Sequence, residues 1–248
     1  MNFKSLNKLN LNDDQATNEE IRERIASGTH INMMDMFILI FAIVIVCIGL
    51  NMNSTSIVIG AMLISPLMGS IIGIAYGISN YDIEWIKKSC VTFLFQIGIS
   101  ILTSLIYFLL SPITVLSSEL IARTEPNIFD VMIAILGGGA AIIANTRKDR
   151  ISNVIPGAAI ATALMPPLCT IGYCLVNHKW LLAGGALYLF SINYFFICLS
   201  TIISLHLMKV TKSNAFFTSF KKKDDFISHL CYHCCAKWLS CSKNSQQK

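Results

Sequence analysis

Two proline motifs lie near the middle of long apolar segments, and they are the residues best suited to form a binding site. Ser65-Pro66 interrupts one segment and Met165-Pro166-Pro167 interrupts another. Proline lacks a backbone donor and clashes with the carbonyl four residues back, so a helix bends or stops there. Serine is a good N-cap and proline fits the first helical position, so Ser65-Pro66 favours the start of a new half-helix. Pro167 can open a second one.

A half-helix that begins inside a membrane presents free N–H groups and a partial positive charge of about half an elementary unit. Two such ends at mid-depth would favour an anion or the negative end of a polar solute. No Lys or Arg lies at that depth to do the same. Further small or polar residues on these and neighbouring segments complete the candidate substrate site: Gly69, Gln96, Asn145, Thr162 and Asn193.

The same residues also fit a purely structural role. Proline kinks are common in membrane helices, and glycines at four-residue spacing are typical of a close-packing helix face. Gln96, Asn145 and Asn193 must face the helix bundle or a wet cavity, because a polar group exposed to lipid is costly. They could join helices by hydrogen bonds or line a pathway. The glycines that fit the packing interpretation are Gly60, Gly69, Gly73 and Gly77.

The composition identifies the setting in which these residues act. The chain has 248 residues, of which 54% are hydrophobic and 13% charged, and its mean hydropathy is +0.62. A soluble domain carries about 25% charged residues, so the main body is a polytopic membrane protein. The net charge of +5 is too small and scattered to indicate a nucleic-acid binder. Most of the nine cysteines lie in apolar segments, which excludes a disulfide framework.

Six apolar segments have about the 20 residues that a membrane-spanning helix needs. Lys and Arg number 17 on one side of these spans and 2 on the other, so the positive-inside rule places both termini in the cytoplasm of a plasma-membrane protein. The predicted spans are 33–50, 56–79, 90–111, 128–145, 153–176 and 181–208.

The six spans form an internal repeat. A shift of 97 residues places the first three spans on the last three, with Gly60 on Gly157 and Gln96 on Asn193. Three spans per repeat is an odd number, so the two repeats enter the membrane from opposite sides, as in many transporters. The predicted fold is therefore all-α, with six transmembrane helices in two inverted three-helix repeats whose second helices are broken. The predicted segments are 1–32 (cytoplasmic), 33–111 (first repeat), 112–127 (extracytoplasmic loop), 128–208 (second repeat) and 209–248 (basic cytoplasmic tail).

The terminal segments predict membrane-surface contacts. Thr17 and Glu20 are spaced as a capping box that opens a short helix through about Ser27. The tail contains Lys221-Lys222-Lys223, which favours anionic lipid. It also has one Cys-x2-Cys pair, at Cys231 and Cys234, with histidines nearby, but a single pair is a weak zinc pattern. We therefore expect no metal and no cofactor.

Enzyme chemistry has little support in the sequence. The spans contain no paired carboxylates, no His-Glu-x-x-His motif and no Ser/His/Asp set at one depth. We expect a transporter or channel for a small anionic or polar solute. The alternative is a non-transporting scaffold or sensor whose tails bind a partner or lipid. The expected partners are membrane lipid and a small solute but no nucleic acid, and six short spans are compatible with a homo-oligomer.

Three runs of the sequence resemble a known membrane family. Gly49-Leu50-Asn51, GAMLISPLMGSIIG from Gly60 and PGAAIATALMPPLCTIGY from Pro156 are similar to the domain of unknown function 389, also called an uncharacterised hydrophobic domain. The resemblance covers about residues 20–208 and implies a multi-span membrane protein without an assigned activity. The family pattern has proline where this chain has Ser70, so the first helix break depends on Pro66 alone.

Overall fold

The computed structural model describes residues 16–29, 32–112, 116–146, 154–208 and 210, with the backbone alone for 154–163. Within these ranges every regular element is a helix, which confirms the all-α prediction there. The N-terminal residues before 16 and the tail from 211, with its lysine, cysteine and histidine motifs, lie outside them. The helices are α1 (Asn18–Thr29), α2 (Met33–Asn51), α3 (Thr55–Met62), α4 (Leu67–Asn80), α5 (Ile83–Leu110), α6 (Ser118–Ala122), α7 (Ile128–Thr146), α8 (Val154–Val176) and α9 (Trp180–Leu207).

Four of these helices are long and apolar enough to cross a bilayer. They are α2, α5, α7 and α9, with 19 to 28 residues each. The pair α3 and α4 forms a fifth candidate span, bent by 54°. The apolar helix α8 has 23 residues. The chain is a multi-pass membrane protein, with four to five candidate spans among the residues searched.

The amphipathic helix α1 marks one end of the helical body. Its capping box forms as predicted: the Thr17 N–H donates to Glu20 Oε2 (3.1 Å) and the Glu20 N–H donates to Thr17 Oγ1 (3.3 Å). Arg24 Nη1 donates to the carbonyl of Asn145, in the last turn of α7 (3.4 Å). Thr92 Oγ1, near the start of α5, donates to the carbonyl of Thr29 (3.0 Å). The helix α1 therefore bridges the end of α7 and the beginning of α5.

The short helix α6 marks the opposite end. Ser117 Oγ donates to the carbonyl of Leu50, in the last turn of α2 (2.6 Å). The end of α2 also meets the end of α5, because Asn51 Nδ2 donates to Ser111 Oγ (3.0 Å). The first turns of α9 lie here too, with Gly185 against the carbonyl of Thr124, which follows α6.

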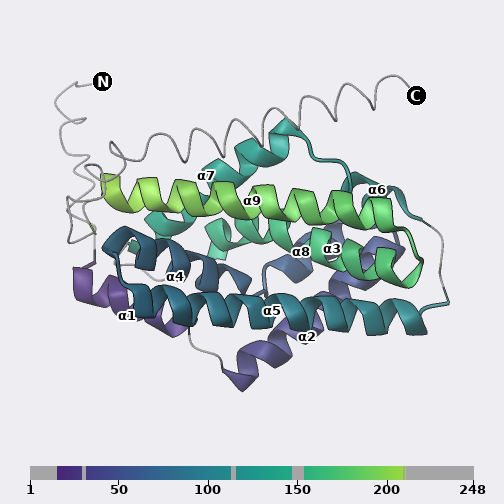
Figure 1. Cartoon of the computed structure of the whole chain (residues 1–248), viewed down its shortest axis with the longest axis horizontal. Coiled ribbons are helices and arrows are strands. Elements are labelled where there is room, and N and C mark those ends of the chain that lie inside the picture. Colours follow the sequence, from purple (N-terminus) through teal and green to yellow (C-terminus); the bar gives the residue numbers. More distant parts are fainter. Residues whose placement is uncertain (1–15, 30–31, 113–115, 147–153, 209, 211–248) are drawn as a thin grey trace, which may run out of the picture. The chain divides into compact units, whose positions relative to one another are not determined.

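It follows that α5 and α9 run in opposite directions. Helix α5 begins at the α1 end and finishes at the α6 end. Helix α9 begins at the α6 end, and Thr146 Oγ1 at the end of α7 donates to the sulfur of Met208, directly after α9 (3.5 Å). In Figure 1 the colours of α5 advance along the sequence from left to right, and those of α9 advance from right to left.

Small residues allow the central helices to pack closely. Helices α4 and α8 each pack against both α5 and α9, while α2 packs on α5 and α7 packs on α9. A Cβ placed on Gly172 of α8 would lie 2.7 Å from Ser104 Cβ of α5. A Cβ on Gly138 of α7 would lie 2.7 Å from the Ile197 carbonyl oxygen of α9. These distances are too short for a larger residue, so glycine sets the helix separation at both contacts.

Candidate functional site

The break between α3 and α4 lies where the sequence predicts it, around Pro66. Helix α3 ends at Met62, and its last turn tightens, with the Ser65 N–H donating to the Met62 carbonyl (3.2 Å). Pro66 has φ −81° and ψ 1°, which does not continue a regular helix. Because proline has no N–H, it also cannot close the next helical hydrogen bond. The bend of 54° follows at this point.

The start of α4 differs by one residue from the prediction. We expected Ser65 as the N-cap and Pro66 as the first helical residue, but Pro66 is itself the N-cap and α4 begins at Leu67. The backbone of Pro66 explains the shift, since its ψ near 0° lies outside the helical range. Ser65 Oγ still accepts from the Leu67 N–H, at 3.4 Å. The hydroxyl therefore contacts the first free N–H of α4, although the hydrogen bond is long.

One turn beyond the break, a buried hydrogen bond joins α4 to α5. Ser70 Oγ donates to Gln96 Oε1 at 2.9 Å, and both side chains are buried. Ser100 Oγ donates to the backbone carbonyl of Gln96 (2.7 Å), which adds a third polar group. Gln96, the polar residue of α5 that the sequence predicts for the site, is therefore oriented inward. The sequence did not indicate Ser70 as a site residue; its only signal was that it replaces the family proline.

The second proline motif does not break its helix, so this prediction is wrong. Helix α8 runs from Val154 to Val176 with Pro166 and Pro167 inside it. Proline removes only its own N–H, and a helix can continue when neighbouring helices hold it. Helix α8 is held in this way between α5 and α9, and both prolines are buried. Within the same helix, Thr170 Oγ1 donates to the carbonyl of Pro166 (2.9 Å).

The other predicted site residues divide between the interior and the α1 end. Asn193 is buried in α9, on the helix that packs against both α4 and α8. Asn145 lies at the α1 end of α7, and its Nδ2 donates to the Ala141 carbonyl (3.0 Å). Gly69 packs against α1, where an added Cβ would lie 2.7 Å from the Gly28 carbonyl oxygen. The backbone at Thr162 is part of α8, but its side chain lies outside the described residues.

The glycine pattern of the broken span has mostly a packing role. Gly69 lies against α1, Gly73 against Thr29, and Gly77 against Ile86 of α5. A Cβ on Gly60 would meet nothing within 4 Å, so that glycine does not belong to the same face. The structural interpretation therefore accounts for three of the four glycines.

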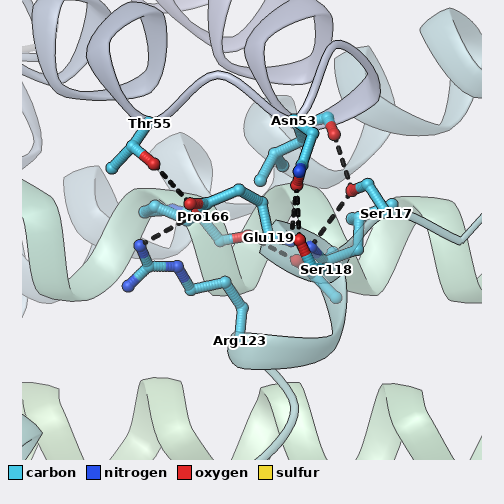
Figure 2. Close-up of polar contacts among 10 residues, drawn as sticks. Asn53, Thr55, Ser117, Ser118, Glu119, Arg123 and Pro166 are labelled. Carbon is cyan, nitrogen blue, oxygen red and sulfur yellow. Dashed lines mark hydrogen bonds and ion pairs between the residues drawn. The ribbon is translucent and has the colours of Figure 1, made fainter.

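Sequence reasoning missed a polar cluster at the α6 end. Figure 2 shows that α6 and the turn between α2 and α3 face each other through polar side chains. Asn53, whose φ is 54°, accepts at Oδ1 from Ser118 Oγ (2.8 Å) and from the Glu119 N–H (3.0 Å). Thr55 Oγ1 donates to Glu119 Oε1, and Arg123 pairs with Glu119 at 3.5 Å. The serine pair before an acidic residue is the signal that could have indicated a capped helix here.

A family model for a domain of unknown function, DUF389, matches residues 62–199, which is more than half of the chain. The chain belongs to this family. An uncharacterised protein of Methanocaldococcus jannaschii is similar to it, with 26% identity over 185 residues. The alignment covers 75% of this chain and 57% of the archaeal protein, so the chain spans a little over half the length of that relative. No solved structure matches the chain significantly.

The DUF389 match begins at the last residue of α3 and ends inside α9. It therefore includes the α3–α4 break, the Ser70–Gln96 hydrogen bond and both prolines of α8. Among the described residues, no three His, Cys, Asp or Glu side chains gather in a metal-binding arrangement. The buried polar groups described in the matched interior include the hydroxyls of Ser70 and Ser100, the amides of Gln96 and Asn193, and the thiols of Cys169, Cys174 and Cys198.

Proposed function

We propose that this DUF389 protein crosses the plasma membrane six times, as two inverted three-helix repeats. The helix bounds support the repeat: α5 spans residues 83–110, and a shift of 97 gives 180–207, the bounds of α9. Helix α8 is then the fifth of the six spans along the chain and the equivalent of the bent pair α3 and α4. The opposite directions of α5 and α9 are what an inverted repeat requires (Figure 1).

The packing of the central helices has the same symmetry. Helix α4 of the first repeat packs on α9 of the second, and α8 of the second packs on α5 of the first. An exchange of the two repeats converts one contact into the other. Each repeat therefore inserts its second helix between the third helices of both repeats.

We further propose that this centre forms a pathway for a small anionic or polar solute. The observation that carries the proposal is the bent span α3–α4, whose break leaves the N–H groups at the start of α4 without helical partners. Such groups favour negative charge. The spans contain no acidic residue away from their ends, so a cation would find only carbonyls, amides and hydroxyls. Transport would require one repeat to move relative to the other.

The second candidate function is a non-transporting scaffold or sensor. The close contacts at Gly172 and Gly138 favour it, because they describe a tightly packed interior. In this interpretation Pro66 serves only to fit α4 against its neighbours. An enzyme is not proposed, since the paired acids and bases of general acid–base catalysis are missing from the spans.

A flux assay separates the two functions. The purified full chain would be reconstituted in liposomes and tested with small anions, cations and neutral polar solutes. The transport proposal expects flux of anions or neutral polar solutes above that of cations. A preference for cations would contradict the proposed site chemistry, and the absence of flux for every solute would favour the scaffold.

A further inference from the structure

A hollow of about 370 Å³ lies beside the first turns of α5, at the end of the helical body that carries α1. Its lining includes Lys87, Lys88, Val91 and Thr92. Both lysine side chains are exposed, while Thr92 is buried and donates to the carbonyl of Thr29 at the end of α1. The hollow is therefore lined by two cationic side chains, by the apolar side chain of Val91 and by the buried Thr92, whose hydroxyl is held by a hydrogen bond.

An exposed apolar strip continues from the hollow along α5. Val91, Leu94 and Leu102 are 60%, 66% and 58% exposed, and they share one face with Lys87 and Lys88 because the spacings are three, four, seven and eight residues. Gly98 interrupts the strip, and a Cβ placed on it would meet nothing within 4 Å. The strip thus has a notch at its middle.

The part of the strip next to the lysines lies within one leaflet of a bilayer. Half of a hydrocarbon core of about 30 Å is roughly 15 Å, which corresponds to about ten helical residues. Counted from Lys87, this length includes Val91 and Leu94, while the exposed apolar face of α5 continues beyond it at Leu102, Ile106 and Leu109. The lysines then lie at the level of lipid headgroups, at the end that the charge distribution assigns to the cytoplasm.

We infer that Lys87, Lys88 and the adjoining apolar residues Val91 and Leu94 bind an anionic glycerophospholipid of the cytoplasmic leaflet. The lysine ammonium groups contact the phosphate, and one acyl chain lies along Val91 and Leu94 and ends at the notch at Gly98. Glu84 is the acidic side chain one turn before the lysines, and it offsets part of their charge. Charge complementarity favours a lipid over a protein partner. The two lysines match an anionic headgroup, and the exposed apolar residues directly beside them match an acyl chain of the same molecule.

The site also has a consequence for α1. Thr92 lines the hollow and holds the last carbonyl of α1. A bound lipid would therefore rest against the residue that anchors α1 to α5. Lipid binding and α1 docking should support each other, independently of whether the chain transports a solute.

Native mass spectrometry of the purified full chain tests this inference. The chain would be titrated with phosphatidylglycerol and with phosphatidylcholine of the same acyl chains. A lysine near an anionic surface contributes roughly a fivefold gain in binding. We expect the native chain to prefer phosphatidylglycerol several-fold, and the double substitution Lys87→Gln with Lys88→Gln to lower that preference to the part contributed by the basic tail. Equal binding of the two lipids by the native chain would overturn the inference.

Three control variants distinguish the site on α5 from binding by the basic tail and from damage to the fold. The tail lysines also attract anionic lipid, so the first control replaces Lys221, Lys222 and Lys223 with Gln. This variant should still bind phosphatidylglycerol more strongly than phosphatidylcholine, and loss of that preference would contradict the inference. Glu84→Gln should strengthen phosphatidylglycerol binding, whereas general damage to the fold would weaken it.

For the acyl strip, Gly98→Leu should reduce binding of both lipids. Gly184→Leu is its matched control, since Gly184 also has open space around its Cβ position. Equal effects of these two leucines would refute the strip as the acyl site.

Discussion

The ring of Phe93 stacks on the ring of Phe190, with centroids 6.2 Å apart and planes 13° from parallel. The two residues are 97 positions apart, which is the spacing of the proposed repeat. Equivalent residues of two repeats can touch only close to the axis that relates them. The contact therefore locates the proposed pseudo-two-fold axis between α5 and α9, three residues before Gln96 and Asn193.

Substitutions at this ring pair should have unequal costs. Phe93 stacks on both Phe190 and Tyr194, the latter at 4.8 Å, while Phe190 has the single stacking contact to Phe93 among the described aromatic pairs. We expect Phe93→Ala to lower the melting temperature in detergent more than Phe190→Ala. A double-mutant cycle should give a coupling of about 0.5–1.5 kcal/mol for the stacked pair.

Phe95→Ala is the matched control for the ring pair. Phe95 lies on the same helix but is 51% exposed, on the face that lipid or detergent would cover. Its replacement should change the melting temperature least. A coupling energy near zero between Phe93 and Phe190 would show that the two rings do not stabilise each other.

The contact between α8 and α5 depends on the absence of a side chain at Gly172. An alanine Cβ there would lie 2.7 Å from Ser104 Cβ and 3.1 Å from the Leu105 backbone nitrogen, so α5 and α8 would have to separate. We expect Gly172→Ala to destabilise the protein by about 1–3 kcal/mol, as overpacking does. Gly184→Ala introduces the same methyl group where nothing lies within 4 Å, and it should be neutral or slightly stabilising. Thermal unfolding in detergent compares the two, and equal melting temperatures would disprove the close contact.

The docking of α1 should depend on Gly69 in the first turn of α4. A Cβ there would lie 2.7 Å from the Gly28 carbonyl oxygen and 2.9 Å from its Cα, both backbone atoms that cannot rotate away. We expect Gly69→Ala to displace α1 and to speed trypsin cleavage after Arg22 and Arg24 several-fold. Mass spectrometry of the fragments identifies these two sites.

Gly60→Ala provides the comparison for α1 docking, because Gly60 is in the neighbouring helix α3 and has open space at its Cβ position. It should leave cleavage in α1 unchanged. If both alanine variants are cleaved at the native rate, α1 is not held by its contact with α4.

Local signals in the sequence predicted the parts of the fold that depend on a few neighbouring residues. The reciprocal hydrogen bonds of Thr17 and Glu20 form within four residues, and the bend of the second span lies at Pro66, where the sequence predicts it. At Pro166 the same local signal did not decide the outcome, because α8 continues through the proline where it packs between α5 and α9. Chain-distant contacts were not predictable in the same way. The hydrogen bond from the Glu119 N–H to Asn53 joins residues 66 positions apart, and no spacing rule relates them.

Single cysteines placed in a cysteine-free chain test the proposed orientation. Glu23 of α1 and Glu125 after α6 are both exposed, and they lie at opposite ends of the helical body. The charge distribution of 17 to 2 predicts that a membrane-impermeant maleimide labels Glu125→Cys on intact cells. Glu23→Cys should react only after the cells are permeabilised. Labelling of Glu23→Cys from outside would reverse the proposed topology.

Replacement of Pro66 tests whether the bend itself is needed for transport. Alanine restores the missing N–H and removes the ring clash, which is worth about 3 kcal/mol in a helix interior, so α3 and α4 can join into one straight helix. The N–H groups at the start of α4 would then bond within the helix and no longer be available to a solute. We expect Pro66→Ala to abolish flux of anions and polar solutes in liposomes while the chain still inserts and unfolds cooperatively.

Pro166→Ala is the matched control, because α8 is already continuous and an added N–H there changes its path little. Ser65→Ala should have an intermediate effect, since its hydroxyl contacts the Leu67 N–H at the long distance of 3.4 Å. Two results would show that transport does not depend on the bend: flux that is unchanged by Pro66→Ala, or flux that Pro166→Ala abolishes as fully as Pro66→Ala does. Pro66 would then have only a packing role.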